Sequence, residues 1–144
     1  MKLMMRFHGE FRKKLDSGNR IVIPARFLNA LGDDPELVCY VHVKEKCIRF
    51  YEYSDFDNII EEAFYQASDV DNSTIKRYIY MNSYSVKPDS RNRVIIPRKF
   101  LKKTGIHDDV VLVGLGSRFE LWDMDTYLEM LSPVDDIEVL EMPF

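Results

Sequence analysis

The sequence contains an internal repeat, and this repeat limits the possible folds more than any other feature. Residues 11–28 align with residues 84–101 at an offset of 73, and nine of the 18 aligned positions are identical. A second match, with an offset of 71, joins 47–56 to 118–127. The chain is therefore two copies of one module of roughly fifty residues, and only two copies favour a pseudo-symmetric pair over a solenoid.

Each copy shows the same succession of local signals. A short strand is followed by turn residues, a β-branched strand, a proline that starts a short helix, and a hairpin. In the first copy we expect strands 11–15, 21–23, 37–43 and 47–53, with a helix over 24–31 that closes on Gly32. In the second we expect strands 84–86, 94–96, 110–113 and 118–122, with a helix over 97–104 that closes on Gly105. Further helices are predicted over 54–67, 74–82 and 123–131.

The net charge of −4 hides two basic blocks. Residues 1–31 carry a charge of +5 and residues 76–103 a charge of +8, so the rest of the chain is strongly acidic. Both blocks coincide with the repeated motif. Charge segregated in this way creates a local positive field that suits a polyanionic partner.

Composition excludes several classes of protein. No apolar run approaches the ~20 residues of a membrane span, and the N-terminal residues lack the apolar region of a signal peptide. Cys39 and Cys47 lie in apolar strands without metal-ligand spacing, so we expect two reduced core cysteines. The sequence therefore predicts a cytoplasmic protein without a bound metal or cofactor. Trp122, Tyr51 and the other aromatic residues are expected in the core.

The repeated motif carries a resemblance to a known family. In both copies a strand leads into Asp-x-x-x-Arg and then an apolar run with proline, which resembles the AbrB/SpoVT swapped-hairpin signature. The two tandem copies, the GEF at 9–11 and VVLVGLGSRFELWD at 110–123 are similar to the MraZ family in particular. One departure is visible: Asn19 and Asn92 stand where the family usually has glycine, and asparagine tolerates a left-handed conformation well.

The resemblance implies a fold of class α+β, mainly β. Two tandem β-β-α-β-β swapped-hairpin modules, 5–53 and 83–131, would form a pseudo-two-fold double barrel. A helical linker, 54–82, would join them, and an acidic tail, 132–144, would follow. One module alone would expose unpaired strand edges, so the two copies must interlock.

The resemblance also implies a function. MraZ proteins are bacterial transcriptional regulators that bind short direct repeats of double-stranded DNA in the promoter of the division and cell wall gene cluster, and they assemble into ring-shaped homo-oligomers. This chain would then act in the cytoplasm, at the nucleoid. The residues expected to contact DNA are Arg20, Arg93, Arg12, Lys13, Lys14, Asn19, Lys87, Arg91 and Asn92.

Two roles for the repeated acid and base remain open at the level of sequence. Asp16 and Asp89 are expected to brace their loops by pairing with Arg20 and Arg93. The arginines could instead point outward to DNA, because a planar guanidinium binds either a carboxylate, a phosphate or a guanine edge. Asn19 and Asn92 could read base edges or only make the turns.

Two other functions compete with DNA binding. Asp16-Ser17-Gly18 matches the motif of aspartic proteases, but the second copy reads Asp89-Ser90-Arg91, and a nearby arginine keeps each carboxylate charged. No catalytic spacing is found elsewhere, so we do not expect an enzyme. The alternative of an antitoxin-like protein-binding module of the same fold rests on the acidic and apolar tail. Such antitoxins usually carry one module per chain, whereas this chain carries two.

Overall fold

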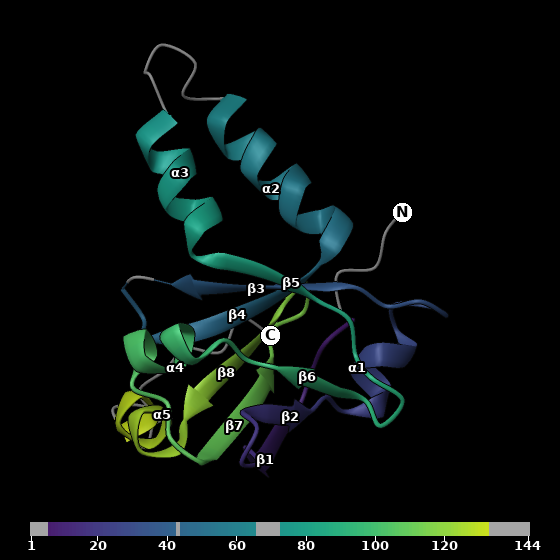
Figure 1. Ribbon diagram of the computed structural model, residues 1–144, viewed down its shortest axis with the longest axis vertical. Helices are drawn as coiled ribbons and strands as arrows, with labels where there is room; N and C mark the ends of the chain where they lie inside the picture. Colours follow the sequence, from purple (N-terminus) through teal and green to yellow (C-terminus); the bar gives the residue numbers. More distant parts are fainter. Residues whose placement is uncertain (1–5, 43, 66–72, 133–144) are drawn as a thin grey trace, which may run out of the picture.

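The computed structural model describes residues 6–42, 44–65 and 73–132, which form eight strands and five helices (Figure 1). The strands are β1 Glu10–Lys14, β2 Arg20–Val22, β3 Leu37–His42, β4 Cys47–Glu52, β5 Ser83–Val86, β6 Arg93–Ile95, β7 Asp109–Gly114 and β8 Phe119–Asp123. The helices are α1 Ala25–Asn29, α2 Tyr53–Tyr65, α3 Ser73–Met81, α4 Arg98–Thr104 and α5 Met124–Leu131. Every predicted element is present, with ends that differ by a few residues within the described part; residue 43 of the third predicted strand and residues 66–67 of the first linker helix lie outside it. Of the predicted acidic tail, all residues after Ser132 lie outside the described part.

Strands of the two modules pair with one another in a single sheet. The large antiparallel sheet has the order β1-β7-β8-β4-β3-β5, so strands of the two copies alternate at three of its junctions. Phe11 of β1 faces Leu112 of β7, and Tyr84 of β5 faces Cys39 of β3. These two pairs are related by the 73-residue offset. The mixed α+β class, mainly sheet, is therefore confirmed, whereas closure into a swapped-hairpin double barrel stays a prediction, as do the domain boundaries.

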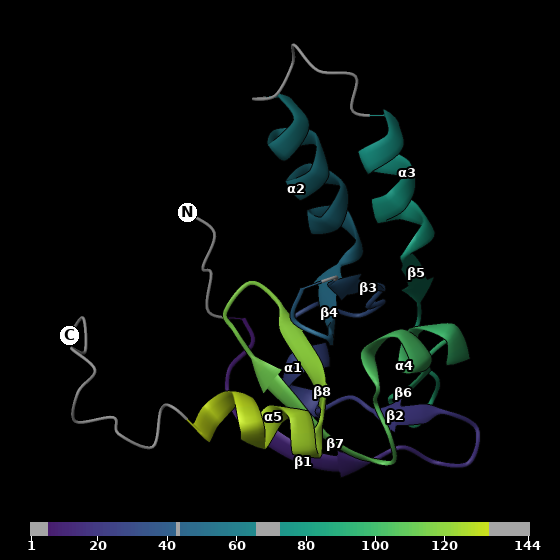
Figure 2. The same ribbon diagram turned by 90° about the vertical axis from the view of Figure 1, so that its left-hand side faces the viewer.

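A two-stranded ribbon of β2 and β6 lies at one end of the molecule. Ile21 pairs with Val94 at its centre, and Arg20 and Val22 pair with Ile95 and Arg93. Because Ile21 and Val94 are equivalent in the repeat, the pseudo-two-fold axis passes between them. Helices α2 and α3 project from the opposite end, as both views show (Figures 1 and 2).

The same axis passes through a charged pair in the large sheet. Arg49 of β4 faces Glu120 of β8, and the second repeat offset of 71 relates these two positions to each other. Nε of Arg49 lies 3.5 Å from Oε2 of Glu120, and the Glu120 side chain is only 4% exposed. Nε1 of Trp122 and Nε of Arg118 donate hydrogen bonds to the same carboxylate, at 3.1 and 3.2 Å.

Phenylalanine rings fill the core beneath the ribbon. Phe50 and Phe119 stack with ring centres 4.8 Å apart, and Phe7 and Phe27 contact Phe119 at 5.1 and 4.8 Å. All four are fully buried and belong to the cluster that contains Ile21 and other ribbon residues. Stacked and edge-to-face rings add to the free energy gained from burial alone. The ribbon is thus fixed to a rigid core contributed by both modules.

Several local predictions are confirmed and some are wrong. Cys39 and Cys47 are free and buried, and burial raises the pKa of each thiol to about 12. Pro24 lies just before its helix, not inside it, because its ψ of 135° is extended. Gly105 ends α4 in the left-handed conformation, as expected.

Burial of the aromatic residues is only partly as predicted. Trp122 and Tyr51 are buried, but five tyrosines are exposed. Three of them are exposed because α3 has no buried residue and β5 lies at an edge of the sheet, and the other two lie at the ends of α2. The exposed tyrosines are Tyr53, Tyr65, Tyr78, Tyr80 and Tyr84. Among the described residues, no helix has the length and apolar character needed to cross a membrane.

Replacement of Glu120 by alanine should lower the free energy of unfolding by about 2 kcal/mol, because it removes the buried carboxylate that Arg49 and Arg118 both contact and leaves the indole N–H of Trp122 without its acceptor. Urea denaturation at one fixed protein concentration would measure the change. Glu120→Gln is the matched control, since its amide oxygen still accepts from Trp122, and its loss should be smaller. Equal midpoints for the alanine variant and the parent would show that the pair on the axis does not stabilise the fold.

Candidate nucleic-acid interface

The first repeated loop, residues 16–20, is held by a single carboxylate. Oδ1 of Asp16 accepts hydrogen bonds from the backbone N–H groups of Gly18 and Arg20, both at 2.9 Å. Oδ2 accepts from Nε of Arg20 at 2.8 Å. The backbone closes the loop as well, because the N–H of Asp16 donates to the carbonyl of Arg20 and that of Asn19 donates to the carbonyl of Asp16. This use of aspartate to bond the backbone two residues on is typical of tight turns.

The second loop, residues 89–93, has the same geometry. Oδ1 of Asp89 accepts from the backbone N–H groups of Arg91 and Arg93 at 2.9 Å, and Oδ2 accepts from Nε of Arg93 at 2.9 Å. Arg91 stands where the first loop has Gly18, and both fit, since neither residue has a positive φ. The repeat in the sequence is therefore a repeat in hydrogen bonding.

Asparagine supplies the left-handed residue in each loop. Asn19 has φ 58° and Asn92 has φ 61°. The backbone carbonyl of each asparagine accepts a hydrogen bond from the other module. The carbonyl of Asn92 accepts from the N–H of Ile23 at 2.8 Å, and the carbonyl of Asn19 accepts from the N–H of Ile96 at 2.9 Å. These crossed bonds extend the ribbon at both ends, so each loop is fixed to the strand of the opposite copy.

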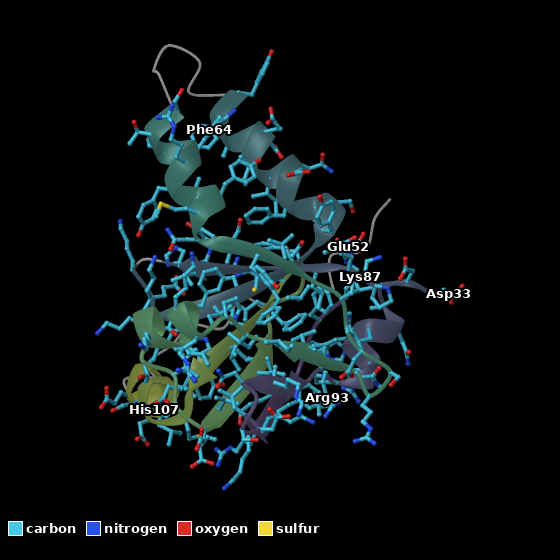
Figure 3. The ribbon with its side chains drawn as sticks, in the orientation of Figure 1. Asp33, Glu52, Phe64, Lys87, Arg93 and His107 are labelled. Atoms are coloured by element: carbon cyan, nitrogen blue, oxygen red, sulfur yellow. The ribbon has the colours of Figure 1, made fainter. Side chains whose placement is uncertain are left out.

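The ion pairs with the aspartates leave part of each arginine side chain available to a ligand. The bond to the aspartate uses Nε alone, and within the described residues neither Nη atom of Arg20 or Arg93 has a hydrogen-bond partner. Both guanidinium groups remain partly exposed. Figure 3 shows Arg93 at the ribbon end of the molecule, far from Phe64 on α2. Each arginine can thus brace its loop and still present two donor nitrogens to a ligand.

The electrostatics keep both carboxylates charged. Hydrogen bonds from the backbone N–H of Arg20, and then from Gly18 and the Arg20 side chain, hold the pKa of Asp16 below its usual value. The corresponding bonds from Arg93 and Arg91 lower the pKa of Asp89. A carboxylate with a lowered pKa stabilises its loop above its ordinary titration range and loses that effect only at acidic pH. This is the reverse of the shared proton in an aspartic protease.

The other predicted contact residues lie within four residues of Asp16 or Asp89 along the chain. Arg12 and Lys14 project from β1 and form only surface ion pairs at 3.5 Å, with Glu10 and Asp109. Such exposed pairs contribute little and are easily exchanged for another anion. Lys13 is half-buried on the same strand and Arg91 is exposed at its loop. Lys87 also forms an exposed pair at 3.5 Å, with Asp34.

The structure adds residues that the sequence pattern did not single out. A hollow of about 260 Å³ lies beside the ribbon, and its lining combines Arg20 and Arg93 with Lys87 and Tyr84. Val22 and Ile95 are exposed on the ribbon although they lie in the apolar run. In a two-stranded ribbon alternate residues face outward, so a β-branched run at this place is buried on one side only.

One further cluster could suggest a metal. Glu45, Cys47 and Glu120 place possible ligand atoms within 4.8 Å of one another. Arg49 and Arg118 pair with these carboxylates, however, and the raised pKa of the Cys47 thiol opposes the thiolate that a metal would need. The cluster is an ion-pair network in the sheet, and we assign no metal to it.

Comparisons with known proteins agree with the motif. The sequence model of the family described as "MraZ protein, putative antitoxin-like" matches residues 6–78 and 79–138. A protein of Mycoplasma mobile named "Transcriptional regulator MraZ" is 35% identical, over 83% of this chain and 80% of its own length. Proteins of the same name from Mycoplasmoides gallisepticum and Mycoplasmopsis pulmonis are 29% and 28% identical, over 84% and 97% of this chain. With two matched modules that span nearly its whole length, the chain belongs to the MraZ family.

Proposed function

We propose that this protein is a sequence-specific DNA-binding transcriptional regulator. One observation carries the proposal: two aspartate-braced loops bring Arg20 and Arg93 to a single ribbon with their Nη atoms unpaired by described residues. The names of the relatives support a role in transcription. The target we propose is a set of short direct repeats in the promoter of the division and cell wall gene cluster. The protein would act in the cytoplasm at the nucleoid.

The ribbon provides the specific contacts. A two-stranded ribbon fits the major groove of B-DNA, where arginine pairs with O6 and N7 of guanine through two donors. The Nη atoms of Arg20 and Arg93 are suitable donors, because Nε already fixes the direction of each guanidinium. Asn19 and Asn92 make the turns and lie beside the same groove. A braced arginine loses little conformational freedom on binding, which favours affinity.

The surrounding cations provide the non-specific part. Arg12, Lys13 and Lys14 on one side, and Lys87 and Arg91 on the other, would contact phosphates and position the ribbon. Release of counterions from those phosphates makes affinity fall with salt. The acidic remainder of the chain keeps DNA on this face.

We further propose that several chains assemble into a ring. Support comes from α2 and α3, where Ile59, Ile75, Tyr78 and Met81 are exposed. The last three recur every third residue on one side of α3, and exposed apolar patches mark interaction surfaces. These helices lie at the end opposite the ribbon, so assembly through them leaves the ribbons accessible (Figure 2). Chains that bind spaced repeats together gain affinity through effective concentration.

An antitoxin-like protein-binding role is the alternative. The description of the matched family as "putative antitoxin-like" supports this alternative. The two functions differ in one readout: a protein-binding module would show no preference for its promoter over random DNA.

Replacement of both Arg20 and Arg93 by alanine should abolish specific binding to the promoter upstream of the gene. Each bidentate contact to guanine is worth about 1–3 kcal/mol, and random DNA as competitor exposes that loss in a gel shift. The size of the oligomer should not change. Arg77→Ala removes an exposed charge on α3 and is the control, and it should bind as the parent does.

Four other outcomes would alter the conclusion. A parent protein without a specific shift would favour the protein-binding alternative. A double variant that binds normally would exclude the arginines as contacts, and one that dissociates would show that they only brace the fold. An affinity of the parent independent of salt would contradict phosphate contact.

Asp16→Ala combined with Asp89→Ala should loosen both loops, because each substitution removes the acceptor of two backbone N–H groups and one guanidinium. Amide hydrogen exchange at Gly18 and Arg91 should accelerate, and specific DNA affinity should fall. The Asp→Asn pair is the control, since its side-chain oxygen can still accept from the backbone, and exchange should stay slow. Unchanged exchange in the alanine protein would show that the carboxylates do not order the loops.

Ile75→Glu should reduce the size of the oligomer, because it places a charge on the exposed apolar surface of α3. Native mass spectrometry would measure the size. Binding to DNA with several repeats should weaken far more than binding to one repeat. Thr74→Glu adds the same charge at the neighbouring exposed position, and an equal effect of both variants would contradict the proposed surface.

A further inference from the structure

The outer face of the β2–β6 ribbon carries two aliphatic side chains that water reaches. Val22 is 42% exposed and Ile95 is 58% exposed. The inward positions of the same strands, Ile21 and Val94, are almost completely buried. Nothing in the packing of the core therefore requires β-branched aliphatic residues at the two outward positions.

These aliphatic side chains are arranged with the arginines in a regular pattern. Ile95 lies directly opposite Arg20, and Val22 lies directly opposite Arg93. Side chains at facing positions of an antiparallel pair are about 4.5–5.5 Å apart at Cβ. Because Val22 and Ile95 occupy equivalent positions of the repeat, each arginine of one module has an aliphatic neighbour from the other. Both modules thus build the same pair of contacts about the pseudo-two-fold axis.

The chemistry of this pattern matches the major groove. Arginine recognises guanine through O6 and N7, whereas aliphatic side chains contact the C5 methyl group of thymine, which only that base presents. We propose that Val22 and Ile95 are specificity-determining residues that contact thymine methyl groups beside the bases bound by Arg20 and Arg93. This inference rests on the proposed function, and it adds thymine recognition to it.

Charge distinguishes DNA from an apolar protein partner at this face. Two guanidinium groups frame the aliphatic pair, and Lys87 lines the adjoining hollow. An apolar partner would have to remove these charges from water at a high cost in free energy. A DNA groove instead supplies phosphates, acceptor atoms and a methyl group within one surface. The larger and more exposed Ile95 should make the stronger methyl contact.

The test removes the methyl groups from the DNA. Duplexes selected by the parent protein from a random pool would be prepared with deoxyuridine in place of each thymine in turn, and Kd measured by fluorescence anisotropy. Uracil keeps every hydrogen-bonding group of thymine. Burial of one methyl group contributes about 0.8 kcal/mol to the free energy of binding, so its loss should raise Kd about fourfold. We expect this loss at one or more thymines.

Variants assign the methyl contacts to residues. In the Val22→Ala/Ile95→Ala protein, thymine and uracil should bind equally at those positions, whereas the dependence of Kd on salt should match that of the parent. Ile95→Val keeps a β-branched side chain and should give an intermediate penalty, which guards against misfolding of the double variant. Leu128→Ala truncates an exposed aliphatic side chain on α5 and should leave the penalty unchanged.

The outcomes separate this inference from the proposed function. Specific binding that depends on Arg20 and Arg93 but not on any thymine methyl would overturn the inference and leave the function intact. A uracil penalty that persists unchanged in both the Ala/Ala and the Ile95→Val proteins would also overturn it. If the parent shows no specific binding at all, the proposed function fails, and the inference fails with it.

Discussion

The structure depends on the crossed hydrogen bonds of the β2–β6 ribbon. Ile23 donates to Asn92 and Ile96 donates to Asn19, so that each repeated loop is attached to a strand from the other copy. Both asparagines that accept these bonds adopt a positive φ. The ribbon rests on the shared phenylalanine core, and its outward face is consequently rigid. A module by itself would have neither the ribbon nor the strand partners β7 and β3 that pair with β1 and β5.

The hydrogen bonds of each braced loop explain why an aspartate and an arginine recur four residues apart in both copies. Both carboxylate oxygens of Asp16 accept hydrogen bonds within the loop, and Arg20 donates to them through its backbone N–H and its Nε. Bracing and ligand contact are then two uses of different atoms of one side chain, which removes the apparent conflict between the roles. The same division holds for Asp89 and Arg93. A site built in this way has its orientation fixed before any ligand arrives, and pre-organisation of this kind lowers the entropic cost of binding.

Much of this arrangement could be predicted from the sequence, because the repeat, the turn residues and the β-branched runs are local signals. The crossing of the modules could be expected only in outline, since no local signal specifies which strand pairs with which. The outward positions of Val22 and Ile95 were missed for a related reason. A continuous apolar run usually indicates a strand that is buried on both faces. Here β2 pairs only with β6, outside the large sheet, and this pairing leaves one face of the ribbon exposed to solvent. Exposure of the tyrosines on α3 escaped prediction likewise, because it reflects how far that helix projects.

The pseudo-two-fold axis makes the differences between the copies informative. A perfectly symmetric ribbon would bind a DNA site equally well in either direction. The direct repeats proposed as the target have a direction, so a protein that binds them in one orientation needs two unequal halves. The scaffold keeps the symmetry of the backbone, yet Arg12 and Lys13 on β1 correspond to Ser85 and Val86 on β5, and Gly18 corresponds to Arg91. On the axis itself, Arg49 faces Glu120, a pairing that two identical chains could not make, since they would place like charges together. Fusion of the copies into one chain thus permits both a stable axis and a directional surface.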